Sequence, residues 1–199
     1  MKETSVVLAG VGGQGALLSA EILGVAAVKE GLNVRVSEIH GMAQRGGAVT
    51  SHVRIGDAVF SPSVLDGQAD VLVGFEPLET LRNIRYASAK TLVLMSNEKI
   101  PPPELAFKKA SYPKLEEIMS KIQRFTKNVV VIDAGKLAKE AGNVLTKNIV
   151  LLGALAATGK VPIKKESIIE ALKELVPPKH VEFNVKAFNL GYQHIKKGV

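Results

Sequence analysis

Hydrophobic positions near the start of the chain predict a strand, a tight turn and a helix in direct succession. An apolar, β-branched run over residues 5–9 has the composition of a buried strand. After a glycine-dense turn, residues 14–29 are apolar at most positions, which predicts a helix covered on most sides. Gly31 follows as a helix stop. This order is typical of the first unit of a doubly wound α/β fold.

The next hydrophobic pattern alternates, and it departs from a plain parallel fold. Residues 33–38 alternate as a strand does, but a polar, glycine-marked loop at 40–47 follows where a crossover helix is expected. A second alternating strand is predicted at 48–55, and residues 55–58 favour a hairpin turn into a short strand at 59–60. We therefore expect an antiparallel excursion within a mixed sheet.

Buried strands and helices alternate through the middle of the chain, and the last quarter is helical. Further strands are predicted at 69–75, 90–96 and 129–133, and helices at 76–86, from 113, at 148–158, at 167–176 and from 180 onward. The pattern predicts an α/β fold with three α/β/α layers. It has a Rossmann-like mixed sheet, an antiparallel hairpin excursion and a helical C-terminal part, all in one domain over residues 1–199.

Two residue patterns within these elements favour structural explanations. Asp133 ends the last predicted strand, where a helix cap is favoured over a functional carboxylate. Gly153, Ala154 and Ala157 punctuate an otherwise large and apolar helix. Small residues at this spacing would let another backbone approach that helix closely.

Composition excludes several classes of protein. Hydrophobic residues make up 46% of the 199 residues, yet no uncharged apolar run is long enough to predict a membrane span. The start of the chain leads straight into a strand without a signal-peptide pattern, so we expect a cytoplasmic protein. Lysines, often beside glutamates, dominate the net charge of +7. With 5% aromatic residues, this favours solvated helix faces over a nucleic-acid surface.

The inventory of catalytic groups is equally restrictive. The chain has no cysteine, so it can supply no disulfide, no thiolate zinc site and no ligand to an iron–sulfur cluster. Its four histidines show no metal-binding spacing. The sequence also lacks the P-loop of nucleotide triphosphatases and the serine elbow of hydrolases.

The glycine turn is the first candidate site. Gly10, Gly12 and Gly15 fit the G-x-G-x-x-G spacing of dinucleotide-binding folds, and Glu38 ends the second strand, about where such folds keep a ribose-binding acid. The free N–H groups of the following helix would suit an anion. The alternative is a turn that is tight for packing or that contacts another protein.

A second cluster of polar residues follows within about fifteen positions. It comprises Glu38, His40, Gln44, Arg45 and His52. Arginine beside glycines is suited to holding a carboxylate or phosphate through two hydrogen bonds. The alternative is a loop ordered by hydrogen bonds of Gln44 and Arg45 to backbone or to another subunit.

Paired motifs across most of the chain resemble a known family. The glycine loop at 10–15, together with residues 37–54, is similar to the gamma-type subunit of 2-oxoacid:ferredoxin oxidoreductases, in particular its indolepyruvate-type branch. Residues 70–79, 148–154 and 184–191 extend the resemblance. The paired motifs are far more specific than the glycine loop alone.

This resemblance implies a reaction and a division of labour. The reaction is oxidative decarboxylation of an aryl 2-oxoacid with coenzyme A as co-substrate, and its electrons pass to ferredoxin. Thiamine diphosphate, Mg and [4Fe-4S] clusters belong to a large alpha subunit in this family. The present chain would then hold no cofactor, depend on that subunit, and self-associate when isolated because its interface is exposed.

The resemblance also suggests which residues face the site, without giving any of them a catalytic role. Those that match the family pattern, and that we expect to face substrate, coenzyme A or the partner, are Gly10, Gly12, Gly13, Gln14, Gly15, Glu38, Gln44, Arg45, Gly46 and Gly47. A self-sufficient dinucleotide-binding protein that uses Gly10, Gly12, Gly15 and Glu38 is the alternative hypothesis.

Overall fold

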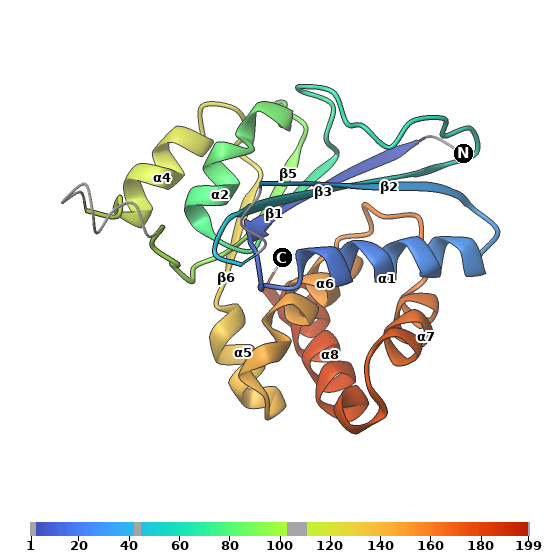
Figure 1. Ribbon diagram of the computed structural model, residues 1–199. Coiled ribbons are helices and arrows are strands. Elements are labelled where there is room, and N and C mark those ends of the chain that lie inside the picture. The colour runs from blue at the N-terminus through green and yellow to red at the C-terminus, as the bar shows by residue number, and fades with distance from the viewer. Residues whose placement is uncertain (1–2, 42–44, 103–110, 199) are drawn as a thin grey trace.

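The computed structural model describes residues 3–41, 45–102 and 111–198, and a single six-stranded sheet runs through them (Figure 1). The strands are β1 (Thr4–Val11), β2 (Asn33–His40), β3 (Ala48–Gly56), β4 (Val71–Gly74), β5 (Leu92–Ser96) and β6 (Val129–Ile132). They lie in the order β2-β3-β1-β4-β5-β6. The pairs β1–β4, β4–β5 and β5–β6 are parallel, whereas β3 is antiparallel to both β1 and β2. The predicted mixed sheet is confirmed.

Helices cover both faces of the sheet, which gives the three predicted layers (Figure 1). One face carries α2 (Pro77–Arg82) and α4 (Leu115–Ile122), and the other carries α1 (Ala16–Lys29), α5 (Ala134–Ala141), α6 (Lys147–Ala157), α7 (Lys165–Leu175) and α8 (Val181–Gly198). Three short 3-10 helices connect them: η1 (Ile84–Tyr86), η2 (Val144–Thr146) and η3 (Pro178–His180). The helical C-terminal part thus forms most of one layer.

The alternation of side chains along β1 explains why both faces are covered. Val6 and Leu8 belong to the core cluster that contains α1 and the C-terminal helices. Val7 and Ala9 belong to the second cluster, on the side of α4 and η1. Because successive side chains of a strand point to opposite faces, a strand that is apolar throughout requires two helical layers.

The position of the antiparallel hairpin corrects one prediction. The hairpin joins β2 to β3, and residues 59–60 form no strand after the expected turn at 55–58. Instead the chain folds back over β3, where Arg54 Nη1 donates hydrogen bonds to the carbonyls of Ser61 and Ser63 at 2.8 and 3.1 Å. Pro62 has no N–H to donate to a neighbouring strand, which disfavours a strand that continues beyond residue 60.

The two smaller structural predictions are confirmed. The carboxylate of Asp133 accepts a hydrogen bond from Lys136 N at 2.9 Å and so caps α5. At the α6–α8 crossing, an added Cβ on Gly153 would collide with the Phe188 carbonyl. The predicted helix over 76–86 is shorter than expected, since α2 ends at Arg82 and η1 follows.

Over the described ranges, no helix combines the length and the apolar character that crossing a membrane requires.

Candidate functional site

The glycine loop lies at the edge of the sheet where the parallel strands end, called here the carboxyl edge. From this edge β1 leads into α1 on one face, while β4 leads into α2 on the other (Figure 1). Such a reversal leaves a crevice between the two strand ends, which is the usual ligand position in open α/β sheets. The fold thus places the glycine loop, which the sequence predicted as a candidate site, where open α/β sheets usually bind their ligands.

Gln14 fixes the loop at this crevice. Its side-chain oxygen accepts a hydrogen bond from Val11 N at 2.8 Å, and its Nε2 donates to the carbonyl of Phe75 at 3.0 Å. The carboxamide therefore ties the end of β1 to the residue that follows β4. It occupies part of the gap between these strands, so Gln14 positions the loop.

The positions of the loop require glycine for different structural reasons. A Cβ on Gly10 would lie 2.9 Å from Phe75 Cβ, and a Cβ on Gly15 would lie 2.5 Å from Asn148 Nδ2. Gly15 also has φ 80°, and Gly13 has φ 101°, which side-chain-bearing residues rarely adopt. At Gly13 an added Cβ meets no atom within 4 Å. Its backbone is therefore open to another molecule.

The second predicted loop lies directly against the first. Gly12 N donates to the carbonyl of Gly47 at 2.8 Å, and Gly46 N donates to the carbonyl of Gly12 at 3.2 Å. Arg45 is exposed beside this junction. Gln44 lies outside the described residues, so its predicted place in the site stays a prediction.

Two helix N-termini adjoin the glycine loop and contribute partial positive charge, while Glu38 and Glu98 line the depressions on its two sides. Neither α1 nor α6 has a side-chain cap or an acidic residue in its first turn. Asn148, near the start of α6, donates from Nδ2 to the carbonyl of Gly15 at 3.3 Å and so holds the two termini together. Unpaired N–H groups at such termini favour an anion.

Depressions open on both sides of the loop. One, of about 480 Å³, is lined by Gly12, Gly13, the first turn of α1, Glu38 and His40. The other, of about 340 Å³, is lined by the loop, Phe75, Ser96 and the Lys147–Glu98 ion pair. Both volumes lie within the usual range of small-molecule sites.

Glu38 lines the first depression, but the strand order differs from that of an ordinary dinucleotide fold. In that fold the strand bearing the acid lies next to β1. Here β3 lies between β1 and β2, and Val49 is the neighbour of Gly10 across the strands. Glu38 is thus two strand spacings from β1, roughly 10 Å. Sequence alone could not reveal this inserted strand position.

His52 does not belong to this site, which corrects the predicted polar cluster. Glu38 pairs with Ser51, so the next residue of β3 points to the opposite face. There His52 is buried, its Nδ1 accepts a hydrogen bond from Val64 N at 3.2 Å, and its ring packs edge-on to Tyr86 at 4.9 Å. Burial, followed by the positive charge of Arg85, lowers the pKa of His52.

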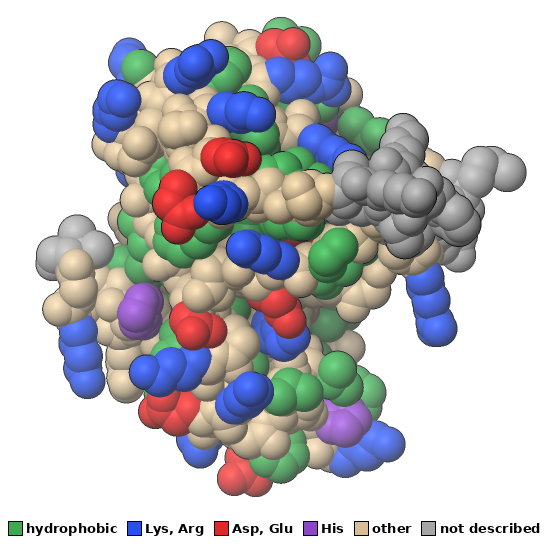
Figure 2. Space-filling view, turned by 90° about the vertical axis from the view of Figure 1, so that its left-hand side faces the viewer, with side chains coloured by type: hydrophobic (Ala, Val, Ile, Leu, Met, Phe, Trp, Pro, Cys, Tyr) green, Lys and Arg blue, Asp and Glu red, His purple; other side chains and the backbone are tan. Residues whose placement is uncertain are grey.

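Several residues of the carboxyl edge escaped the sequence analysis. Asn148, Lys147 and Glu98 come from the second half of the chain and reach the glycine loop only through the fold. The available signals were the polar pair Lys147 and Asn148, directly before the apolar run of α6, and the family match over residues 148–154. Figure 2, which views this edge, shows basic and acidic side chains interspersed with hydrophobic ones.

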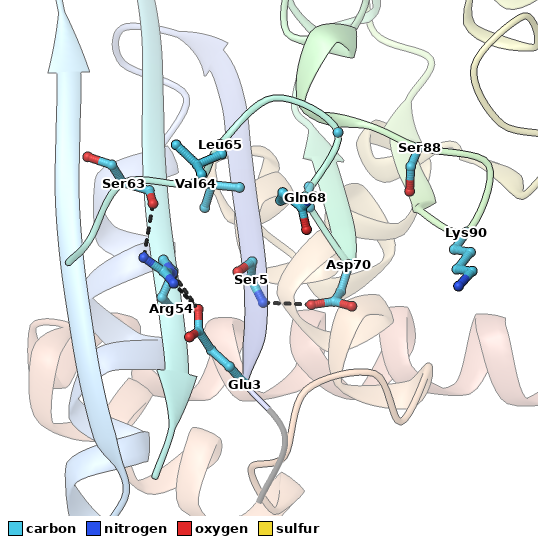
Figure 3. A pocket seen from close by; sticks show the side chains of 12 residues that line it. Glu3, Ser5, Arg54, Ser63, Val64, Leu65, Gln68, Asp70, Ser88 and Lys90 are labelled. Carbon is cyan, nitrogen blue, oxygen red and sulfur yellow. Dashed lines mark hydrogen bonds and ion pairs between the residues drawn. The ribbon is translucent and has the colours of Figure 1, made fainter. Parts of the chain in front are cut away.

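The opposite end of the sheet offers a contrast. A depression of about 470 Å³ lies there, and three of its four charged lining residues, Glu3, Arg54 and Asp70, bind other protein groups (Figure 3). Arg54 pairs with Glu3 and donates to two carbonyls, while Asp70 accepts from Ser5 N at 2.8 Å. These contacts join β1, β3, β4 and the segment after β3. The internal pairing indicates a structural junction.

The described residues contain no group of three His, Cys, Asp or Glu side chains arranged to hold a metal ion. The sequence without cysteine also offers no thiolate to a cluster. The residues of this chain therefore do not fit an iron–sulfur cluster.

Comparison with known proteins places the fold and the sequence in one family. The sequence model of the family described as pyruvate ferredoxin/flavodoxin oxidoreductase matches residues 5–194. A curated relative, the indolepyruvate oxidoreductase subunit IorB of Pyrococcus horikoshii, is 47% identical over 99% of this chain and 98% of its own length.

Solved structures agree with this assignment. The gamma subunit of a keto/oxoacid ferredoxin oxidoreductase from Geobacter sulfurreducens PCA is 26% identical with a TM-score of 0.70, over 98% of this chain and 99% of its own. The pyruvate oxidoreductase subunit PORC of Thermotoga maritima shares the fold at 23% identity and a TM-score of 0.72, over 97% of each chain. The chain belongs to the pyruvate ferredoxin/flavodoxin oxidoreductase family, as a gamma-type small subunit of a 2-oxoacid ferredoxin oxidoreductase.

Proposed function

We propose that this chain is the small subunit of a thiamine-dependent enzyme that oxidatively decarboxylates an aryl 2-oxoacid, indolepyruvate, to the acyl-CoA and reduces ferredoxin. The observation that carries the proposal is the 47% identity, over almost the full length of both chains, to a protein named as an indolepyruvate oxidoreductase subunit. A cytoplasmic location is part of the proposal.

The proposal assigns the cofactors to a larger partner. Thiamine diphosphate, Mg and the [4Fe-4S] clusters would lie on an alpha subunit, because this chain has no cysteine to bind a cluster. The isolated chain would then be inactive and would self-associate through the surface that the partner covers in the complex.

Within that assembly, the carboxyl edge would face the partner's site, coenzyme A or the 2-oxoacid. Support comes from its chemistry. The available donors are the open backbone at Gly13, the guanidinium of Arg45, and the first-turn N–H groups of α1 and α6, which have no side-chain cap. Such donors would hold a carboxylate or a phosphate.

Stand-alone dinucleotide binding is the second candidate, favoured by one observation. Glu38 and the glycine loop line the same depression. Against it stand the strand between β1 and β2 and the Gln14 carboxamide within the crevice. Titration of the purified chain with NAD, NADP and FAD separates the two functions, because submillimolar binding of any of them would favour the second.

Reconstitution tests the proposal directly. The chain is to be co-expressed with the larger cysteine-rich chain of the same organism, and turnover of indolepyruvate with coenzyme A measured with a viologen dye as acceptor. We expect activity only when both chains are present. Turnover by the large chain alone at the rate of the mixture would contradict the proposal.

A further inference from the structure

A cluster of lysines lies where the start of α7 meets the last turns of α8. The ammonium of Lys165 lies 4.6 Å from the ring centroid of Tyr192, and that of Lys196 lies 5.8 Å from the same centroid. Lys164 and Lys197 are the exposed sequence neighbours of these two residues. We call Lys165 and Lys196, together with these two exposed sequence neighbours, the lysine patch.

The charges of the lysine patch are not neutralised within the described parts of the chain. Lys29 and Lys147 each pair with a glutamate, but these structured regions show no ion pair for any lysine of the patch. The carboxylate of Glu30 accepts from the backbone N–H of Lys164, at 2.7 Å, and not from its ammonium. Two ammonium groups on one ring repel each other, and a nearby acidic group relieves that repulsion.

The composition of the patch indicates the kind of contact it makes. Permanent subunit interfaces have an apolar core, but the large exposed hydrophobic residue of α8 is Phe183, at the opposite end of that helix. Exposed lysines instead give fast, salt-dependent association with a negative surface. The patch is therefore suited to an acidic protein that binds and leaves repeatedly.

From these observations we infer that the lysine patch docks an acidic face of the ferredoxin that collects electrons from the assembled enzyme. The inference rests on the proposed function, because the carrier is the one protein in that reaction that must exchange at each turnover. The patch takes no part in electron transfer itself. It raises the rate at which the carrier encounters the complex.

The test uses the two-subunit complex with the double substitution Lys165→Glu and Lys196→Glu. The matched control is Lys121→Glu with Lys127→Glu, which makes the same charge change at exposed positions in and after α4. Turnover is measured at low ionic strength, once against ferredoxin concentration and once with methyl viologen. We expect the KM for ferredoxin to rise about tenfold in the patch variant, with the viologen rate unchanged.

Each other outcome has a defined meaning. An unchanged KM for ferredoxin, or an equal rise in the control, would overturn the inference. So would loss of binding to a random single-stranded RNA without any change in that KM. A wild-type complex that does not turn over indolepyruvate with viologen would contradict the proposed function instead. In that case the role of the lysine patch is tested by titrating ferredoxin into the isolated wild-type chain, the patch variant and the control variant. Equal binding by all three proteins would overturn the inference.

Discussion

The α6–α8 crossing and the glycine loop both depend on glycine, but for different reasons. At the crossing, a Cβ on Gly153 would strike the main-chain carbonyl of Phe188, and a Cβ on Gly191 would strike that of Val150. Both obstacles are backbone atoms inside regular helices. In the loop, the obstacle at Gly15 is the side chain of Asn148, and at Gly13 there is none within 4 Å.

This difference separates glycines needed for packing from those that leave backbone accessible. The crossing is filled by protein and has no space for another molecule. The loop combines both kinds, since Gly10 and Gly15 make room for protein atoms while Gly13 faces open space. The glycines of such a motif therefore serve both close packing within the protein and access for another molecule.

The largest expected effect is at the crossing. Gly191→Ala would stabilise an isolated helix, yet here the new methyl group meets a carbonyl that cannot move without shifting α6. We expect a loss of about 3 kcal/mol in the free energy of unfolding, measured by chemical denaturation. Gly198→Ala, on the same helix with nothing within 4 Å, is the control and should be near neutral.

Gly15→Ala should have an intermediate effect. The substitution forces alanine to φ 80° and brings its methyl group against Asn148. We expect a loss of about 2 kcal/mol, of which the left-handed backbone accounts for about half. In the double variant with Asn148→Ala the collision is gone. Strict additivity of the two single changes would show that Asn148 is not the obstacle.

Gly13→Ala isolates the backbone contribution. Its φ of 101° is unfavourable for alanine, but no atom obstructs the methyl group. We expect a loss of about 1 kcal/mol in the free energy of unfolding, which comes from the backbone alone. We also expect reduced turnover of the reconstituted enzyme, because the methyl group projects into the space that a ligand or the partner would occupy. A loss as large as that at Gly191 would erase the distinction between the two regions.

Acid should weaken the fold through His52, which lies outside both glycine regions. The pKa of His52 is lowered in the folded protein, so the unfolded chain binds a proton first as the pH falls. This contribution to stability is complete above about pH 6.5, and it is lost progressively below that value until the folded pKa is reached. Denaturation midpoints at several pH values measure the slope. His52→Asn should flatten it, and an unchanged slope would assign acid sensitivity elsewhere.

Arg45→Ala should leave stability almost unchanged, because the side chain is exposed. If Arg45 holds a carboxylate or phosphate, turnover of the reconstituted enzyme falls far more than association with the partner does. Unchanged turnover with intact assembly would reject that role. Gly191→Ala thus tests a residue needed for packing through stability, and Arg45→Ala tests an accessible residue through turnover.

The sequence was sufficient for the layers and for the glycine loop. Unbroken apolar strands with β1 at their centre require helices on both faces of the sheet. The polar loop after β2 predicted the antiparallel excursion. It was insufficient for the end of that excursion. Val59 and Phe60 look like a strand in isolation, but the contacts of Arg54 with the carbonyls of Ser61 and Ser63 decide their path.

The site was predicted only in part for a similar reason. Local spacing identified Gly10–Gly15, Arg45 and Glu38, because each belongs to a short pattern. Asn148 and the Lys147–Glu98 pair reach the loop through contacts between distant elements, which periodicity does not encode. The face on which His52 lies follows from strand register, and a shift of one residue would have reversed it.

Amide hydrogen exchange of the chain, alone and in complex with the large subunit, tests the central claim most directly. We expect exchange to slow in peptides covering the glycine loop and Arg45–Gly47 when the partner binds. Peptides of the α6–α8 crossing, already buried, should exchange as slowly in the free chain as in the complex. Unchanged exchange in the glycine loop of an active complex would contradict the claim that this loop faces the partner or its substrates.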